Sequence, residues 1–378
     1  MSVFQVELKK TVDDSYEIEI GRSLADRLAE DLKNGLMGSL RKFALITDTH
    51  VEALYAEPVC RKLRDAGFDG EIFSFPAGEA YKTRETKADI EDRMLAAGYR
   101  RDCFVAAVGG GVVSDLAGFL AGTFGRGVPF INYATTLLAA ADASIGGKTA
   151  VDTPLATNLI GLFHQPKKVY IDIDCWNTLP EREISSGLAE TVKHACLADA
   201  DFFRYLEVHM DEIRKVSPEA CEEIARRNCG IKYRVVMKDE REAGLREVLN
   251  LGHTVGRAVE TLSGYRLLHG EAVSIGLTAA CALSVRMGFM TGAEADRVSR
   301  LLERAGLPVR IPGYIDREAL VRKLYTDKKV RNGRLRFVIP RGIGDVVEFR
   351  PGVFAEEISE ETAREIILGM AEEKEVRP

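Results

Sequence analysis

The chain has little that would tie it to a membrane, to nucleic acid or to an oxidising compartment. Its seven cysteines are scattered over 378 residues without paired spacing, which argues against a disulfide framework and a cysteine-type zinc site and fits a reducing cytosol. The longest apolar stretches, such as 273–289, are broken by Ser, Gly and Arg, so none provides the ~20 apolar residues that span a bilayer. The formal net charge is -6, and residues 1–21 lack the apolar segment of a signal peptide. We therefore expect a cytoplasmic protein with no nucleic-acid or membrane partner.

The first half of the chain alternates strand and helix patterns. Period-two alternation at 3–10 and 16–21 predicts an edge hairpin. Further strands are predicted at 42–48, 71–76, 103–111, 128–134 and 168–174, with helical patterns between most of them. Strands that alternate with helices are typical of parallel βαβ units, so we expect an open α/β sheet.

The second half has almost no strand signal. Helical patterns cover 182–198, 218–240, 251–260, 270–288 and 291–306, and one small hairpin is predicted at 334–349. Because 378 residues suit about two domains, we place a boundary within 174–180, where a proline and turn residues occur.

A polar stripe crosses the predicted helix around 251–260. Residues recur at helical spacing as Arg246, Asn250, His253, Arg257 and Glu260, where an amphipathic helix usually carries Leu and Val. Apolar side chains off the stripe can supply the buried face. We expect one helix whose second, polar face has a chemical role.

Two glycine-rich segments could bind an anion. "VGGGVVSDLAG" (108–118) follows a predicted buried strand and opens a helix, which suits a nucleotide phosphate, although it lacks the GxGxxG spacing and could be a plain tight turn. "ASIGGKTAVD" (143–152) places Lys148 after two glycines, with Asp142 before it and Asn158 after it. It is not a Walker A loop, and a solvated loop lysine is the alternative.

A metal site could form in the helical half. Glu190 and Lys193 lie three apart on one helix face, His253 lies on the polar stripe, and His269 is at the start of a helix. One Glu and two His from three helices are a plausible catalytic metal set with an open position. The spacing does not fix this set, because His50, His164, His194 and His209 compete and Lys232 could reach the same cleft or be solvated.

Several long motifs in order resemble 3-dehydroquinate synthase, a sugar phosphate cyclase family. They are "GGGVVSDLAGFLAGTFGRGV", "TTLLAAADASIGGKTAVD", "SGLAETVKH", "DEREAGLREVLNLGHT", "HGEAVSIGL" and "DKKVRNGRLRFVIP", and they extend over roughly 45–347. The resemblance implies an α/β N-terminal Rossmann-like nucleotide-binding domain at 1–176, followed by a mainly α-helical metal- and substrate-binding domain at 177–378.

The resemblance also implies residue roles. The positions that match NAD contacts are Asp48, Glu79, Lys82, Gly110, Gly111, Asp115, Thr135, Thr136, Thr178 and Glu183. Those that match zinc ligands (Co²⁺ being an alternative ion) are Glu190, His253 and His269. Those that match substrate positions are Asp142, Lys148, Asn158, Lys193, Lys232, Arg246, Asn250, Lys328 and Lys329. Arg126 matches an arginine that reaches the phosphate site of a neighbouring subunit, which implies a homodimer.

The chemistry implied by the resemblance uses NAD without consuming it. Zinc holds two substrate hydroxyls, NAD oxidises one carbon, phosphate leaves by elimination, the ketone is reduced again, and an aldol step closes the ring. Two positions depart from the family pattern: Arg257 replaces a histidine, and Ala134 replaces a proline. Arg257 keeps positive charge but cannot shuttle a proton, because the pKa of arginine is above about 12.

The leading hypothesis is therefore 3-dehydroquinate synthase of the shikimate pathway, acting on a small-molecule sugar phosphate. A sibling cyclase such as an aminodehydroquinate synthase is the first alternative, because of Arg257. A metal-dependent NAD polyol dehydrogenase is the second, although the phosphate-type Lys and Asn set argues against it. A non-catalytic binding protein with the same fold is the third, and the complete set of metal-ligand types argues against it.

Overall fold

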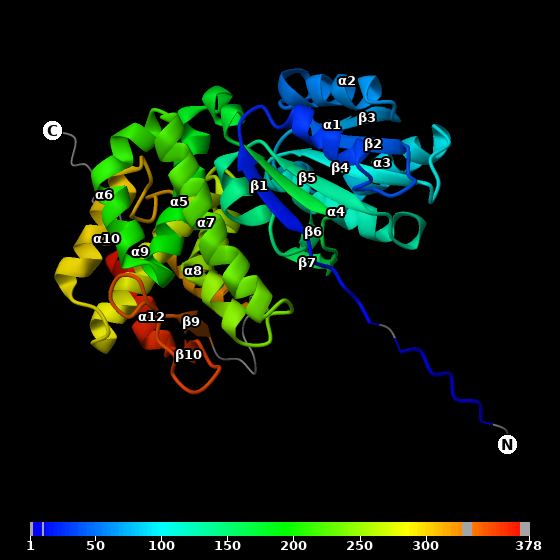
Figure 1. Cartoon of the computed structure of the whole chain (residues 1–378). Coiled ribbons are helices and arrows are strands. Elements are labelled where there is room, and N and C mark those ends of the chain that lie inside the picture. Colours follow the sequence, from blue (N-terminus) through cyan, green and yellow to red (C-terminus); the bar gives the residue numbers. More distant parts are fainter. Residues whose placement is uncertain (1–2, 10, 327–334, 371–378) are drawn as a thin grey trace.

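The computed structural model describes residues 3–9, 11–326 and 335–370, and it consists of a parallel sheet with flanking helices beside a largely helical part (Figure 1). No helix in these ranges is both long and apolar enough to cross a membrane. The short helical turns of the chain are η1 (Glu52–Ala56), η2 (Glu79–Tyr81), η3 (Phe124–Arg126), η4 (Ala139–Ala143), η5 (Ile173–Thr178) and η6 (Leu245–Asn250).

A six-stranded parallel sheet has the strand order β1-β8-β5-β4-β2-β3. Its strands are β1 (Glu17–Gly21), β2 (Lys42–Asp48), β3 (Asp69–Phe75), β4 (Cys103–Gly109), β5 (Phe130–Ala134) and β8 (Lys168–Asp172). Every residue of β4, β5 and β8 is buried, as expected for parallel strands with helices on both faces. The sheet confirms the predicted open α/β architecture.

Helices cover both faces of this sheet. Residues of α1 (Ala25–Lys33) and α2 (Glu57–Asp65) share one apolar cluster with Leu45. Residues of α3 (Arg84–Ala96) and α4 (Gly111–Thr123) share another cluster with Ala44. Because neighbouring residues of a strand point to opposite faces, the adjacent pair Ala44 and Leu45 connects β2 to both layers.

The predicted N-terminal hairpin is wrong. Residues 3–9 form no strand, and β1 instead pairs in parallel with β8. The structure has a different hairpin that the sequence reading missed, formed by β6 (Lys148–Thr153) and β7 (Ala156–Phe163). This hairpin packs on α4, where a Cβ at Gly118 would lie 2.4 Å from Thr149 Cγ2, so the glycine allows the close approach. Lys148 therefore begins a strand and does not lie in a loop.

The helical part is built around α5 (Glu181–Ala198), which is buried without interruption from Ile184 to Leu197. It packs against α6 (Ala200–Arg214), α7 (Pro218–Lys238), α9 (His269–Met287) and α10 (Gly292–Arg304). It also approaches the turn after β5, where a Cβ at Gly187 would lie 2.7 Å from Leu137. Through α5, the helical part and the sheet share one continuous core.

The remaining elements are α8 (His253–Leu262), α11 (Arg317–Thr326), α12 (Glu360–Gly369), β9 (Arg336–Val338) and β10 (Ala355–Glu357). The hairpin predicted at 334–349 is confirmed in part. Pro340 and Val346 form an antiparallel bridge, and the amides of Arg341 and Val347 donate to the carbonyl oxygens of Asp345 and Ile339. The strand β9 itself pairs antiparallel with β10, which the prediction did not include. The single helix predicted for the polar stripe is wrong. Arg246 and Asn250 lie in the turn η6, Gly252 has a left-handed backbone (φ 78°), and α8 begins only at His253.

Candidate active site

Three buried or half-buried side chains from three helices converge on one point. Glu190 lies in the middle of α5, while His253 and His269 are the first residues of α8 and α9. Glu190 Oε1 lies 3.6 Å from the Nε2 atom of each histidine. All three ligand-type atoms lie within 4.8 Å of one another. The structure thus brings together the three residues that the sequence reading grouped as metal ligands.

The Nδ1 atom of each imidazole contacts an oxygen atom, which orients the ring. His253 Nδ1 lies 3.2 Å from the carbonyl oxygen of Leu251, and His269 Nδ1 lies 3.3 Å from Glu260 Oε2. If each Nδ1 carries the hydrogen, each Nε2 presents a lone pair toward Glu190. Metal-bound histidines usually have such an oxygen partner behind them.

The donor set fits a divalent zinc-type ion. One carboxylate and two imidazoles are a common protein set for catalytic zinc, and they leave a position for substrate. Both oxygens of Glu190 are buried and lack a well-oriented hydrogen-bond donor among the described residues, although Lys193 Nζ forms an ion pair with one of them. An oxygen atom in that state is a ready ligand.

The charges around this point are strongly coupled. Burial alone would raise the pKa of the Glu190 carboxyl, but the Lys193 ammonium holds that pKa below its usual value. Burial also lowers the pKa of His253 far below its usual range. Burial would lower the pKa of His269 as well, but the carboxylates of Glu260 and Glu190 raise it to about 10.

A second group of charges adjoins the first. Lys232, on α7, donates to Asp142 Oδ1 at 2.7 Å, and its side chain is only 5% exposed. Asp142 belongs to η4, which packs between α5 and α7. Burial lowers the pKa of Lys232, while Asp142 partly offsets that effect. Asp142, Lys193 and Lys232, which were predicted from three separate motifs, therefore lie in one cluster.

Glu242 is a functional candidate that the sequence reading missed. Its carboxylate forms an ion pair with Lys148 and accepts a hydrogen bond from Asn250 Nδ2 at 2.5 Å. Its backbone is left-handed (φ 59°), which is unusual for a residue other than glycine or asparagine. One acidic side chain thus holds two predicted substrate residues together. The signal was present in the quoted motif "DEREAGLREVLN", in which Glu242 lies four residues before Arg246.

Arg246 is buried, and two of its guanidinium nitrogens donate to backbone carbonyl oxygens. It donates to the carbonyl oxygens of Gly146 (2.9 Å) and Glu240, while its buried Nε has no hydrogen-bond partner among the residues that the structure describes. It therefore connects the loop before β6 to the segment after α7. Any contact with a bound anion would have to use the donor capacity that remains.

Other predicted substrate residues are further apart. Arg257 is half-buried on α8, one turn after His253. Asn158 is exposed on β7, with a left-handed backbone (φ 52°), several residues along the hairpin from Lys148. Arg126 is exposed at the end of η3, beyond α4. Lys328 and Lys329 lie outside the described residues.

The predicted cofactor residues gather at the carboxyl ends of neighbouring strands. Gly110 and Gly111 follow β4 and begin α4, while Thr135 and Thr136 follow β5. A Cβ at Gly110 would lie 3.0 Å from Thr136 Cγ2, so a side chain there would crowd the residues that follow β5. The Thr135 hydroxyl is buried without a hydrogen-bond partner among the residues described. Bare backbone amides at a helix start and an unsatisfied hydroxyl fit a dinucleotide phosphate.

Lys82 organises three carboxylates at the same edge of the sheet. It contacts Glu79, lies 3.5 Å from Asp115, and lies 3.8 Å from Asp152 at the end of β6. Burial would lower the pKa of Lys82, but these carboxylates raise it overall. Burial raises the pKa of Asp115 to about 7. Asp152 is a further member that the sequence reading did not assign.

The last predicted cofactor residues are near the junction of the two parts. Asp48, at the end of β2, accepts hydrogen bonds from the backbone amides of His50 and Val51. Thr178 Oγ1 lies 2.6 Å from the Tyr55 hydroxyl. Burial raises the pKa of Glu183, in the first turn of α5. The structure places all three at the side where the sheet meets α5.

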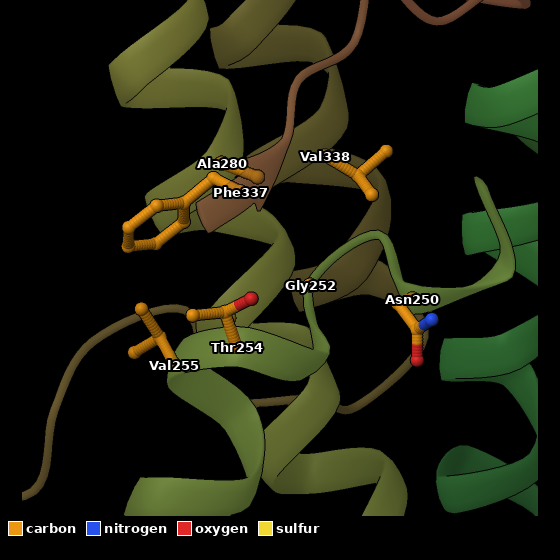
Figure 2. Close-up of a pocket in the computed structure, with 8 residues that line it drawn as sticks. Asn250, Gly252, Thr254, Val255, Ala280, Phe337 and Val338 are labelled. Atoms are coloured by element: carbon orange, nitrogen blue, oxygen red, sulfur yellow. The ribbon is translucent and has the colours of Figure 1, made fainter. Parts of the chain in front are cut away.

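A small hollow lies beside the first turn of α8. Figure 2 shows the hollow, which is lined by Thr254 and Val255 of α8, by Ala280 of α9 and by Phe337 and Val338 of β9, with Asn250 at its edge.

A parallel sheet with a glycine-rich strand-to-helix turn, beside a helical part with a candidate Glu-His-His metal set, is typical of α/β proteins that combine nucleotide and metal chemistry. Models of the 3-dehydroquinate synthase N-terminal and C-terminal regions match residues 72–186 and 187–330. The chain belongs to the 3-dehydroquinate synthase family.

Individual relatives agree with this assignment. The chain is 44% identical to a 3-dehydroquinate synthase of Pelobacter propionicus, covering 92% of this chain and 95% of the relative. It is 45% identical to that of Azotobacter vinelandii, covering 92% and 93%. Among solved structures it is similar to ValA, a 2-epi-5-epi-valiolone synthase from Streptomyces hygroscopicus subsp. jinggangensis 5008 with NAD⁺ and Zn²⁺ bound, with a TM-score of 0.85, 29% identity and coverage of 97% and 99%.

Proposed function

We propose that this chain is a 3-dehydroquinate synthase that converts 3-deoxy-D-arabino-heptulosonate 7-phosphate into 3-dehydroquinate and phosphate. The observation that carries the proposal is the Glu190–His253–His269 set directly beside Lys193, which joins a metal-type site to a cluster of cations. A substrate with a phosphate, a carboxylate and neighbouring hydroxyls has the groups that such a site can bind.

The proposed cofactors are NAD at the carboxyl ends of β2, β4 and β5, and Zn²⁺ on the Glu-His-His set, where Co²⁺ would also fit. When bound, zinc lowers the pKa of a coordinated hydroxyl and NAD accepts a hydride from that carbon. Glu190, His253 and His269 would hold the metal, and Glu260 would keep the His269 ring in place.

Substrate charge would be met by the side chains around the metal set. Lys193 and Lys232 are buried next to Asp142. Because water is largely excluded there, the two ammonium groups would attract a bound anion more strongly than they would in bulk water. Lys148 and Asn250 share Glu242, so the approach of an anion to these two donors must rearrange that carboxylate. The predicted roles of Arg246, Arg257, Asn158, Lys328 and Lys329 in substrate binding remain part of this proposal.

Phosphate release from the heptulosonate phosphate is the test. The wild type should release phosphate with no net accumulation of NADH, whereas a polyol dehydrogenase would accumulate NADH with an alcohol. Lys232→Met should lower kcat/KM by about 10- to 100-fold, the cost of one charge-assisted hydrogen bond. Lys215→Met is the matched control, because Lys215 is exposed after α6. No phosphate release from wild type loaded with zinc and NAD would sink the proposal.

Arg257 decides between this reaction and a sibling cyclase that acts on an aminated substrate. If Arg257 is a phosphate contact, Arg257→His should leave turnover of the heptulosonate phosphate within a few-fold. A large rate increase in the variant would favour the aminodehydroquinate synthase alternative, because the native arginine would then be adapted to another substrate.

We also propose that the protein is a cytoplasmic homodimer whose two domains are residues 1–176 and 177–378. The exposed Arg126, on left-handed backbone beyond α4, is free to extend toward a neighbouring subunit's phosphate site. Arg126→Ala and Lys232→Met should each lower activity strongly, but a purified hybrid dimer would have one site with both side chains and about half of wild-type activity. An inactive hybrid would contradict the shared site.

A further inference from the structure

The N-terminal segment Val3–Lys9, called the arm here, has the pattern of a strand without a partner. Phe4, Val6 and Leu8 share one face of the extended chain, whereas Gln5, Glu7 and Lys9 share the other. The side chains of that apolar face are between 76% and 88% exposed. Figure 1 shows the arm extending away from the body of the protein. This alternation is the feature that predicted a hairpin with β1, a pairing that the structure does not have.

An exposed strand edge that suits the arm is present on the hairpin β6–β7. The outer edge of β6 is partly covered, because Asp152 bridges to Thr83. Within the described ranges, β7 pairs with β6 alone. Leu155, just before β7, is 91% exposed and Leu159, within it, is 50% exposed.

The other edge strands of the α/β part offer less apolar surface. Both β1 and β3 lie at the ends of the six-stranded sheet, and neither has a strongly exposed large hydrophobic side chain. An apolar arm gains most where apolar surface is already exposed, so β7 is the better acceptor.

The root of the arm lies beside this hairpin. The backbone amide of Gly146, two residues before β6, donates to the Tyr16 hydroxyl at 2.9 Å, and Tyr16 directly precedes β1. The arm and the acceptor edge therefore leave the body from adjacent places. A two-fold axis that brings two hairpins together would also bring each arm to the other copy.

We propose that the arm adds to the free edge of β7 in a second copy of this chain, with Phe4, Val6 and Leu8 covering Leu155 and Leu159. Strand addition supplies backbone hydrogen bonds to an open edge and apolar contacts on alternate side chains. The exchange is reciprocal, so one dimer buries two arms. It rests on the homodimer proposed above. Because β7 carries Asn158, the partner's arm would also support a predicted substrate residue.

Cysteine cross-linking between two single variants tests the location of the arm. All seven native cysteines are buried, so introduced thiols should react first. Leu8→Cys and Leu159→Cys proteins are mixed, allowed to exchange subunits, and then treated with a short bis-maleimide. A covalent dimer that contains one chain of each variant is expected. Gln5→Cys, on the opposite face of the arm, is the matched control and should cross-link less.

The double variant Leu8→Cys/Leu159→Cys distinguishes the alternatives. A link within one chain at low concentration would overturn the proposal, because it would place the arm on its own hairpin. No link in either format would also overturn it.

Mass measurement gives an independent result. Sedimentation of Val6→Asp/Leu8→Asp protein should show dimerisation weakened by at least about 100-fold, since both arms lose buried apolar contacts, whereas Gln5→Asp should match wild type. If Val6→Asp/Leu8→Asp protein dimerises as well as wild type, the proposed strand addition by the arm is contradicted and the homodimer is not. If the wild type is monomeric, both proposals are contradicted. Phosphate release by the wild type is assayed separately, so failure of the proposed reaction is recognised on its own.

Discussion

The close crossing of α8 and α9 sets the distance between two proposed metal ligands, and Gly276→Ala tests it. A Cβ at position 276 would lie 1.8 Å from the carbonyl oxygen of Gly252 and 2.7 Å from the amide nitrogen of Gly256. Ordinary contact begins near 3.4 Å, so the two helices would have to separate by about 1.6 Å. Figure 2 shows Gly252 next to Thr254, where α8 starts, so the movement would be transmitted to His253.

Two quantities should change in Gly276→Ala protein. The clash is with backbone and cannot be relieved by a rotamer change, so we expect a loss of about 3 kcal/mol in the free energy of unfolding, at the upper end for overpacking. Metal ligands tolerate displacements of only about 0.2 Å, so zinc affinity should fall by at least about 100-fold. Urea unfolding of metal-free protein and chelator competition measure the two effects separately.

Gly292→Ala is the control for this experiment. Gly292 is the first residue of α10, and a Cβ there would meet nothing within 4 Å. Its unfolding free energy should stay within about 0.5 kcal/mol of wild type. If Gly276→Ala matched this control in stability and kept wild-type zinc affinity, the helix crossing would not position His253, and the reasoning would be refuted.

Three further outcomes follow from charged contacts. Glu260→Gln should weaken zinc binding by about 10- to 100-fold in chelator competition, because His269 loses its charged partner; an unchanged affinity would contradict this. Lys82→Met should cost about 3–5 kcal/mol in urea unfolding at pH 7, because buried carboxylates lose their cation; a neutral effect would contradict it. Lys168 holds the pKa of Asp31 below its usual value despite burial, so the stabilisation by Asp31 exists above about pH 4 and is lost as the pH falls further. Asp31→Asn should therefore cost about 2 kcal/mol at pH 7, and that deficit should shrink in urea titrations below pH 4 rather than stay constant.

Local patterns predicted the sheet well because its strands are recognisable by themselves. The fully buried strands β4 and β8 show no clear alternation of apolar and polar residues, yet their flanking turns and helices identify them. The hairpin β6–β7 was missed because Gly161, Pro154 and several polar residues disguise its alternation. It is held by contact with α4, which no local pattern reveals.

The site could be predicted in composition but not in shape. Helical spacing placed Arg246, Asn250 and His253 on one stripe of a single helix, but a left-handed glycine divides them between η6 and α8. The break turns Asn250 toward Glu242 and leaves His253 at a helix start. A period of three to four does not distinguish one helix from two short elements that follow one another.

The balance of charge around the proposed metal explains why the site suits an anionic sugar phosphate better than a neutral polyol. Each carboxylate here already has a cationic or histidine partner. Glu190 faces the two histidines and Lys193, Asp142 pairs with Lys232, and Glu242 pairs with Lys148. A neutral polyol would gain only hydroxyl contacts from this arrangement. A substrate phosphate or carboxylate can instead compete with Glu242 for Lys148, because it offers the same oxygen chemistry. The exchange of one anion for another keeps the partly exposed Lys148 paired throughout, so substrate binding does not leave a new unpaired charge at this position.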